Sequence, residues 1–344
     1  MKLIIQIPCY NEETSLPIAL KALPKAIPGV DDIEILIIND GSTDRTLEVA
    51  QANGVHHVVG FASNQGLARG FMLGIKSCLE RGADIIVNTD ADNQYNAADI
   101  PALIAPIVAQ EADMVIGARP IQTIEHFSFV KKALQAIGSF VVKLVSGTQV
   151  ADAPSGFRAF SRDAALSLNV FSRYTYTLET IIQAGQKNLR VVSIPIRVNP
   201  DLRPSRLMRS LSGYVIKSVI TIVRMFVVYR PFRFFMLLGA LVFSGGFAIG
   251  VRFVYFYLTG DGTGKIQSLI LAAVLLMIGF HTMLLGFVTD LLAVNRKLLE
   301  ELQQAERRRQ LENSRSHGTA LMERSAHLME APGQQERQKL ASVE

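Results

Sequence analysis

Tryptophan is absent from this chain of 344 residues, cysteine occurs only twice, and charged residues make up only 19%. Two cysteines, Cys9 and Cys78, are too few for a disulfide framework, so free thiols in a reducing compartment are expected. The scarcity of charge accompanies a hydrophobic share of 49%, which is high for a soluble enzyme. The net charge of +5 is informative only once it is mapped along the chain, and no nucleic-acid partner is expected.

Long apolar stretches are concentrated in the last third of the chain. Residues 234–251 carry no charge, residues 266–289 contain one histidine, and each stretch approaches the ~20 residues needed to cross a bilayer. We predict transmembrane helices at 232–258 and 266–294, joined by an extracytoplasmic loop at 259–265. Two buried helices of a soluble domain are the weaker alternative, because the stretches lie in tandem and the first contains four glycines.

Positive charge flanks both stretches on the side away from the short loop. Seven Lys and Arg residues lie between Arg203 and Arg233 and five between Arg296 and Arg309, whereas the loop holds one Lys and one Asp. The positive-inside rule therefore places both flanks in the cytoplasm and the protein in the cytoplasmic (inner) membrane. The apolar stretch near the amino terminus is strand-sized and lacks a cleavage region, so no signal peptide is expected and residues 1–202 should form a cytosolic domain.

The segments around the predicted spans are polar or amphipathic. Residues 203–231 are predicted to form a basic acceptor-closing segment followed by an amphipathic helix in the membrane interface, with its cations nearly on one face. Residues 295–312 should form a charged cytosolic helix, and residues 313–344 a flexible tail. A short leucine stripe at 298–302 leaves a homo-oligomer open, although two turns are weak evidence for a coiled coil.

Residues 1–202 alternate between short apolar segments typical of strands and longer segments typical of helices. The predicted strands are 3–8, 34–40, 55–61, 84–90 and 113–119. The predicted helices are 13–27, 42–54, 67–82 and 98–110. This alternation predicts an α/β domain, with a mostly parallel sheet covered by helices on both faces.

The most specific motif is NTDADNQY, residues 88–95, in which Asp90 and Asp92 follow an apolar strand directly. Open α/β sheets bind ligands at the carboxyl ends of their strands. Two carboxylates at this spacing can share one hard divalent cation, and such a cation usually has substrate phosphates among its ligands. In an arbitrary protein a bare D-x-D is most often a polar loop, but its place in this domain favours a site for a nucleotide diphosphate.

Polar residues also follow the first two predicted strands. Those after the first strand include Pro8, Tyr10, Asn11 and Glu12. After the second strand, Asp40 is suited to accept a hydrogen bond from a base or ribose, and Gly41 allows the backbone to approach closely. Helix capping is an equally good interpretation for Ser42 and Asp44 but a poorer one for Asp40. All these loops should open on one edge of the sheet.

Five motifs occur in a fixed order: IPCYNEE, IINDGSTD, NQGLARG, TDADNQ and SGFRAF. Together they resemble the family-two inverting glycosyltransferases of GT-A fold, a Rossmann-like α/β architecture. Within that family the chain is most similar to polyprenyl-phosphate glycosyltransferases, such as dolichol-phosphate mannose synthases and bactoprenol glucosyltransferases. The resemblance extends over residues 1–230, and five ordered motifs rarely coincide by chance.

The resemblance implies roles for individual residues. The nucleobase and ribose of a UDP- or GDP-sugar are expected at Pro8, Tyr10, Glu12 and Asp40. The further contacts predicted for the nucleotide sugar are Asn11, Gly41, Gln65, Asp90, Ala91 and Glu179. A divalent cation, Mg or Mn, is expected on Asp90, Asp92 and Gln94, with Asp92 also in a catalytic role. For Glu179 a helix cap is the alternative, and NQGLARG by itself would be an ordinary loop.

The acceptor side of the site is less sharply defined. Asp152 is a predicted catalytic residue that could act as a base or could orient Arg158. A phosphomonoester acceptor is largely dianionic at neutral pH, so a strong base is unnecessary. Arginine grips phosphate through two parallel hydrogen bonds. The residues predicted to meet the acceptor phosphate are Arg119, Arg158, Arg203, Ser205 and Arg206.

These features predict a membrane-anchored, metal-dependent, inverting glycosyltransferase. It would transfer a hexose-type sugar from a nucleotide diphosphate to a polyprenyl phosphate, undecaprenyl or dolichyl phosphate, at the cytosolic membrane face. A transferase that acts on another lipid such as diacylglycerol, and a non-catalytic nucleotide-sugar-binding scaffold, are the alternatives. Processive synthases of the family carry a Q-x-x-R-W motif, which the absence of tryptophan excludes here.

Overall fold

The computed structural model describes residues 1–120, 139–140, 142–143, 146–170, 176–200, 216, 220, 223–224, 227–260 and 266–340. The acceptor-phosphate residues Arg203, Ser205 and Arg206 lie outside the described residues, as does most of the predicted interfacial helix.

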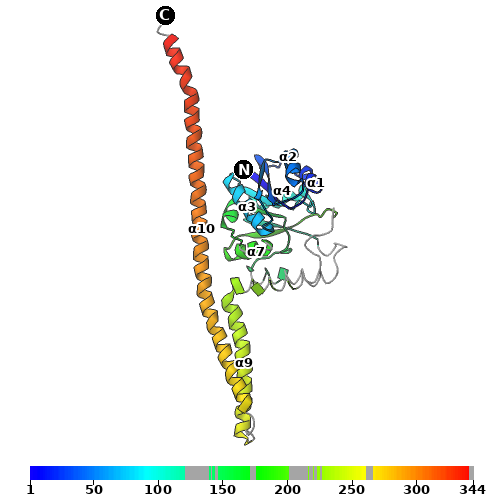
Figure 1. Ribbon diagram of the computed structural model, residues 1–344, viewed down its shortest axis with the longest axis vertical. Helices are drawn as coiled ribbons and strands as arrows, with labels where there is room; N and C mark the ends of the chain where they lie inside the picture. The colour runs from blue at the N-terminus through cyan, green and yellow to red at the C-terminus, as the bar shows by residue number, and fades with distance from the viewer. Residues whose placement is uncertain are drawn as a thin grey trace. The chain divides into compact units, whose positions relative to one another are not determined.

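A mixed sheet of seven strands forms the centre of the amino-terminal domain (Figure 1). Its strands are β1 (Lys2–Cys9), β2 (Asp32–Asp40), β3 (His57–Phe61), β4 (Ile85–Asn88), β5 (Met114–Ala118), β6 (Arg158–Ser161) and β7 (Val191–Pro195). Their order in the sheet is β3, β2, β1, β4, β6, β5, β7. Strand β6 runs antiparallel to β4 and β5, and the other neighbours are parallel. The predicted, mostly parallel sheet is confirmed.

Helices cover both faces of this sheet. They are α1 (Leu16–Ala22), α2 (Thr46–Ala52), α3 (Leu67–Glu80), the short η1 (Ala97–Asp99), α4 (Ile100–Val108), α6 (Arg162–Ser167) and α7 (Thr177–Gln186). On one face, Leu3 and Ile5 of β1 share a core with Leu20 of α1 and Leu103 of α4. On the other face, Gly74 of α3 packs against Gln6 and Ile38. Because side chains alternate along a strand, β1 needs apolar residues at nearly every position.

The five predicted strands all exist, but β6 and β7 were not predicted. Strand β6 has only four residues and contains Arg158, and β7 is only partly buried, so neither shows a clear apolar period. The omission has a structural consequence. Strand β6 pairs Arg158 with Asn88 at the end of β4, which places the loop before β6 beside the loop that carries Asp90 and Asp92.

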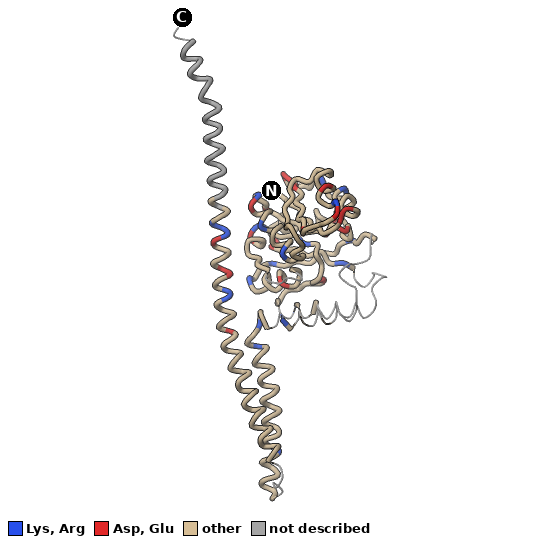
Figure 2. Tube along the Cα trace, viewed as in Figure 1, with Lys and Arg blue, Asp and Glu red and all other residues tan. Residues whose placement is uncertain are grey.

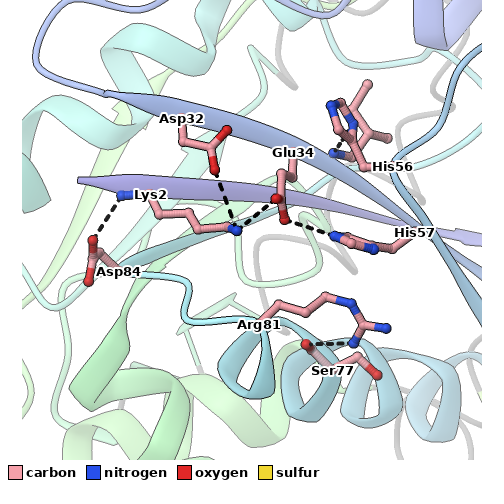
Figure 3. A network of polar contacts seen from close by, with 9 residues as sticks. Lys2, Asp32, Glu34, His56, His57, Ser77, Arg81 and Asp84 are labelled. Atoms are coloured by element: carbon pink, nitrogen blue, oxygen red, sulfur yellow. Dashed lines mark hydrogen bonds and ion pairs between the residues drawn. The ribbon is translucent and has the colours of Figure 1, made fainter. Parts of the chain in front are cut away.

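A polar network ties the strands together at the edge opposite to these loops (Figure 3). The two carboxylate oxygens of Glu34 in β2 bind Lys2 Nζ at 2.7 Å and His57 Nε2 at 2.9 Å. Lys2 also donates its backbone N–H to Asp84, just before β4, at 2.8 Å. Residues of β1, β2, β3 and the turn before β4 are thereby held in register.

Replacing Glu34 with glutamine should make the stability of the protein less dependent on acid pH. Burial alone raises the pKa of Glu34, but the hydrogen bonds from Lys2 and His57 outweigh burial and lower it. The folded state therefore binds the proton less readily than the unfolded state, in which the pKa is about 4.3. The stabilisation is complete above that unfolded value and is lost as the pH falls through the lower folded value.

We expect the Glu34→Gln variant to lose about 1 kcal/mol at neutral pH, since the ion pair is only partly buried. Thermal unfolding of the detergent-purified full chain, repeated from neutral to acid pH, measures this loss. The difference from wild type should shrink in acid, and the exposed Glu111→Gln control should show no difference at any pH. A deficit that stays constant into acid would contradict the assignment.

Two helices after the domain are long and apolar enough to cross a membrane: α9 (Pro231–Leu258) and the first part of α10 (Ile266–Leu340). Their most apolar windows have mean hydropathies of 2.1 and 2.3, and only 11% and 17% of those windows are buried. The core helix of a soluble protein would be mostly buried. Figure 2 shows this hairpin almost free of charged residues, with charges returning further along α10. The predicted spans at 232–258 and 266–294 correspond to these helices.

Helix α10 continues to Leu340 without interruption, through the segment predicted as a flexible tail. The charged helix predicted at 295–312 is part of the same element. Residues Leu299–Glu344 form a compact unit of their own. Their sequence is rich in Glu, Gln, Arg, Ala and Leu, which all have high helix propensity, so a helix does not require an apolar period here.

Glycines bring α9 and α10 into close contact. A Cβ atom on Gly246 would lie 2.8 Å from the backbone nitrogen of Leu276, and one on Gly279 would lie 2.6 Å from the backbone nitrogen of Phe243. A Cβ on Gly245, the preceding residue of the same helix, would have no heavy atom within 4 Å. Only one of these two adjacent glycines is therefore required for helix packing.

Gly246→Leu should separate the two helices and destabilise the hairpin by about 1–3 kcal/mol, the usual cost of overpacking. Gly245→Leu is the matched control, because it adds the same side chain one position earlier and meets open space. The thermal midpoint of the detergent-purified protein should fall for the first variant only. Equal midpoints for the two variants would show that the helices do not pack through Gly246.

Candidate functional site

Three loops meet at the carboxyl ends of the neighbouring strands β2, β1 and β4. Direct hydrogen bonds join the first two loops. The backbone N–H of Asn11 donates to Ser42 Oγ at 3.1 Å, and Thr43 N–H donates to Asn11 Oδ1 at 2.8 Å. Ser42 therefore bridges two loops, and α2 begins later, at Thr46. This edge is where α/β sheets bind ligands.

Asp40 at the end of β2 organises the neighbouring loop. Its two carboxylate oxygens accept the backbone N–H groups of Gln65 at 2.7 Å and Gly66 at 2.9 Å, just before α3. Gly41 has a φ of +69°, and a Cβ there would lie 2.5 Å from the backbone of Ser63. The motifs IINDGSTD and NQGLARG are therefore physically joined. Contact of Asp40, Gly41 and Gln65 with the nucleotide stays a prediction.

The remaining residues predicted for the nucleotide differ in exposure. Tyr10, immediately after β1, is 42% exposed. Pro8 is half-buried, and Ala91 is buried. Glu12 is buried and accepts a hydrogen bond from Ser15 Oγ at 2.6 Å. Of this group, Tyr10 is therefore the best placed to stack on a base.

Asp90 and Asp92 form an electrostatically strained pair after β4. Burial, followed by the negative charge of Asp92, raises the pKa of Asp90 to about 7, although Arg119 acts in the opposite direction. Asp92 Oδ1 accepts the backbone N–H of Gln94 at 3.1 Å. The intervening Asn93 has a φ of +56° and closes the turn. A nearby cation would relieve the repulsion between the two carboxylates.

The possible ligand atoms of Asp90, Asp92 and Gln94 fit a divalent cation that the protein coordinates only in part. Among the residues that the structure describes, no three His, Cys, Asp or Glu side chains converge on a metal site. Asp90 and Asp92 supply carboxylate oxygens and Gln94 an amide oxygen, which are hard ligands suited to Mg or Mn. Such an ion would need phosphate or water oxygens to complete its coordination.

Buried polar residues around the end of β4 support the Asp90 and Asp92 pair. Asn88 accepts from Gln6 Nε2 at 2.9 Å and donates through Nδ2 to the Gly156 carbonyl at 2.9 Å and the Tyr176 hydroxyl at 2.8 Å. The Gly156 N–H donates to Tyr95 Oη at 2.9 Å. A Cβ on Gly156 would lie 3.2 Å from Asp90 Oδ2, which is a tight contact, so the backbone of Gly156 packs closely against this carboxylate.

No role was predicted from the sequence for Asn88, Tyr95 or Tyr176, although the first two are the end residues of the motif NTDADNQY. The one available signal was Asn88, a polar residue at the end of an otherwise apolar strand. Tyr95 and Tyr176 lie far apart in sequence and meet Gly156 only in the folded chain.

Arg119 and Asp152 form an ion pair beside the site. Arg119 Nε donates to Asp152 Oδ2 at 2.7 Å and Nη2 donates to Oδ1 at 3.1 Å. The Arg119 backbone N–H also reaches Oδ2, at 3.3 Å. The side chains of Asp152 and Arg119 are 1% and 11% exposed. Because both oxygens of Asp152 accept from Arg119, the prediction that Asp152 acts as a base is disfavoured, and Asp152 instead orients Arg119.

Arg158 does not fit its predicted role on the acceptor phosphate. Its side chain is fully buried. It donates to the carbonyls of Ala153, Ser155 and Thr177 and to Thr180 Oγ1. These contacts fasten the loop before β6 to helix α7, so the guanidinium has a structural role. The error arose because sequence alone cannot distinguish an arginine that binds carbonyl groups from one that binds phosphate.

Glu179 lies in the first turn of α7 and is buried. It accepts the Tyr229 hydroxyl at 2.9 Å, and Gln186 Nε2 donates to the Tyr229 carbonyl at 3.2 Å. The guanidinium of Arg296 lies 4.6 Å from the centre of the Tyr229 ring. Glu179 thus contacts Tyr229, which lies just before the start of α9 at Pro231. Its contact with a donor sugar stays a prediction.

Comparisons with known proteins agree with this geometry. The model of glycosyl transferase family 2 matches residues 4–168. Over 230 residues the chain is 28% identical to an undecaprenyl-phosphate mannosyltransferase of Micrococcus luteus, covering 64% of this chain and 93% of that protein. Over 213 residues it is 30% identical to a UDP-N-acetylglucosamine–dolichyl-phosphate N-acetylglucosaminyltransferase of Methanococcus voltae, covering 56% and 83%.

Among solved structures, the fold is similar to that of glucosyl-3-phosphoglycerate synthase from Mycobacterium tuberculosis in complex with Mn2+, UDP and phosphoglyceric acid. The TM-score is 0.50 at 18% sequence identity, and the match covers 64% of this chain and 78% of that one. The sheet and its polar edge define a GT-A-like domain. The chain belongs to glycosyltransferase family 2, as its ordered motifs predicted.

Proposed function

We propose that this protein transfers a hexose-type sugar from a UDP- or GDP-sugar to a polyprenyl phosphate, with inversion at the anomeric carbon. The observation that carries the proposal is the Asp90 and Asp92 pair at the carboxyl edge of the sheet, between the loops after β1 and β2 and the Arg119–Asp152 ion pair. The names of the relatives from Micrococcus luteus and Methanococcus voltae support the class of acceptor.

In the proposed reaction, an oxygen of the lipid phosphate attacks the anomeric carbon from the face opposite to the nucleotide. The bond from that carbon to the diphosphate breaks, and its electron pair leaves with the nucleoside diphosphate. The acceptor is already largely dianionic near neutral pH, so no protein base has to remove a proton. The protein would contribute alignment of the reacting atoms and a favourable electrostatic environment.

Each of these contributions can be assigned to particular residues. Tyr10 would stack on the base, and Asp90, Asp92 and Gln94 would hold Mg or Mn. That cation, when bound, would neutralise charge that develops on the departing diphosphate. Complexes of the structurally similar synthase with Mn2+ and UDP support this proposal. Of the two described arginines predicted for the acceptor phosphate, Arg119, oriented by Asp152, is the better candidate, because its side chain keeps 11% exposure whereas Arg158 is fully buried.

Helices α9 and α10 would anchor the enzyme in the cytoplasmic membrane, with the catalytic domain in the cytosol. Their apolar windows and the cationic residues on both flanks support this orientation. A lipid phosphate would then be presented at the headgroup level of the same leaflet. Two spans suit an anchor better than a conduit for polymer.

The test is release of nucleoside diphosphate by the detergent-purified full chain. A panel of UDP- and GDP-sugars is offered with Mn or Mg, with undecaprenyl phosphate, dolichyl phosphate, diacylglycerol or no lipid. We expect release that requires a polyprenyl phosphate and is abolished by a chelator. NMR of the purified glycolipid should show the anomeric configuration opposite to that of the donor.

Other outcomes would favour the alternatives. Release with diacylglycerol but not with either polyprenyl phosphate would identify a different lipid acceptor. Nucleotide binding without release under every pairing would favour a nucleotide-sugar-binding scaffold. Retained configuration in the product would contradict a single displacement.

A further inference from the structure

Asn199 holds the turn that carries Asp92 and Gln94. Its backbone N–H donates to the Gln94 carbonyl at 2.9 Å. Its side-chain Nδ2 donates to the Asn93 carbonyl at 2.9 Å and to the Tyr95 carbonyl at 3.3 Å. An asparagine has three N–H hydrogens in all, one on the backbone and two on the side chain. Asn199 thus engages three consecutive carbonyls of one turn.

Three fixed carbonyls determine the peptide planes of the turn. The planes that carry the Asn93 and Gln94 carbonyls lie on either side of the Gln94 Cα and so set the direction of its Cα–Cβ bond. The first of these planes also contains the Gln94 N–H, which donates to Asp92 Oδ1 at 3.1 Å and so orients the Asp92 carboxylate. Asn93 lies in this turn with a φ of +56°, a conformation that a non-glycine residue adopts infrequently. The bonds from Asn199 favour this conformation over its alternatives.

Asn199 is itself held by the sheet. The preceding residue Val198 forms an antiparallel bridge with Tyr95. Ile196 N–H donates to the carbonyl of Ala118 at 3.0 Å, immediately before Arg119. The turn that carries Asp92 and Gln94 and the end of β5 just before Arg119 are thus both attached to the same short stretch of chain after β7. None of the five sequence motifs includes this stretch.

We propose that Asn199 is a positioning residue for the cation and diphosphate site. The inference rests on the proposed function, because it assumes that Asp92 and Gln94 bind a cation. Asn199 would act through the turn without touching the nucleotide. Its loss should weaken the cation-dependent part of nucleotide binding and leave the cation-independent part in place.

The experiment compares Asn199→Ala with wild type and with Asn53→Ala in the detergent-purified full chain. Asn53 is a matched control, because its side-chain amide also donates to a carbonyl, that of Val49 at 2.8 Å, at the end of α2. Calorimetry measures the affinity for UDP and for GDP, with and without Mn2+. Thermal unfolding of each variant checks the fold.

We expect Asn199→Ala to weaken Mn2+-dependent nucleotide binding about tenfold, equivalent to about 1.4 kcal/mol. Binding without Mn2+ should be unchanged, and the Asn53→Ala control should match wild type in both conditions. Asn199→Asp, which keeps the size but replaces the NH2 donor by a carboxylate facing carbonyls, should lose at least as much. In turnover, a higher Mn2+ concentration should restore most of the rate of Asn199→Ala.

Two results from the variants would overturn the inference. One is an unchanged Mn2+ dependence in both Asn199 variants. The other is an equal loss of binding with and without Mn2+ together with a lower thermal midpoint, because this pattern indicates a purely structural residue. If wild type binds nucleotide with Mn2+ but transfers sugar to no lipid, the proposed function fails while the binding comparison still tests Asn199. If wild type binds neither nucleotide more tightly with Mn2+, the inference is also overturned.

Discussion

Replacing Asp92 with asparagine is expected to lower the rate of sugar transfer about a thousandfold, equivalent to about 4 kcal/mol of transition-state stabilisation. The substitution removes one of two carboxylates from the proposed cation site and keeps the size of the side chain. Asparagine also retains an oxygen that can accept the Gln94 N–H, now at 3.1 Å from Asp92 Oδ1. The turn should therefore persist while the affinity for the cation falls.

The measurement combines nucleoside diphosphate release with calorimetry of UDP and GDP in the presence of Mn2+. Both transfer and Mn2+-dependent binding should fall, while the thermal midpoint stays close to that of wild type. Asp113→Asn is the control, because it removes a carboxylate that pairs with the half-exposed Arg190 at 3.0 Å outside the site. An Asp92→Asn protein that transfers sugar at the wild-type rate would show that this carboxylate does not hold the cation.

Replacing Asp152 with alanine is expected to destabilise the protein by about 3–5 kcal/mol, because it leaves the charge of Arg119 largely buried without its carboxylate partner. The two side chains are 1% and 11% exposed and share two hydrogen bonds, at 2.7 Å and 3.1 Å. The thermal midpoint of the detergent-purified chain measures the effect. Asp113→Ala, which breaks the more exposed pair with Arg190, should cost less than about 1 kcal/mol.

A double variant separates structure from chemistry at this pair. Arg119→Met combined with Asp152→Leu removes both charges and should recover most of the lost stability, as apolar replacements of buried ion pairs often do. Its activity should remain low, because the arginine proposed for the acceptor phosphate is gone. A contrary result would be an Asp152→Asn protein of wild-type stability whose turnover alone is lost, since that pattern is expected of a catalytic base.

The apolar periodicity of the sequence was sufficient to predict the parallel strands β1 to β5. Strands buried on both faces need continuous apolar runs, and each such run can be recognised in the sequence without knowing where the others lie. The same holds for α9 and the first part of α10, whose length and apolarity are local properties. Strand β6 was missed because its four residues include a buried arginine, which only its pairing with β4 and β5 explains.

The pairing of side chains was decided by the tertiary structure. From the sequence alone, Asp152 and Arg158 were natural partners six residues apart, yet Asp152 binds Arg119 and Arg158 binds carbonyl groups. Asp40 was predicted to face the nucleotide, and it also fixes the start of α3. A charged side chain can satisfy its hydrogen bonds with many different groups, and its neighbours in space depend on loop paths that no local pattern encodes.

The sequence by itself determined the family, the strand-end location of Asp90 and Asp92, and the two apolar helices. These properties depend on residues that are adjacent or regularly spaced along the chain. Only the tertiary structure decided that Tyr176 and Asn199 support the site, because each reaches it across a large distance in sequence, and that Asn88 supports it through bonds to residues distant in sequence. Hydrogen bonds are short and directional, so the identity of a supporting residue is fixed only when the strands are in register.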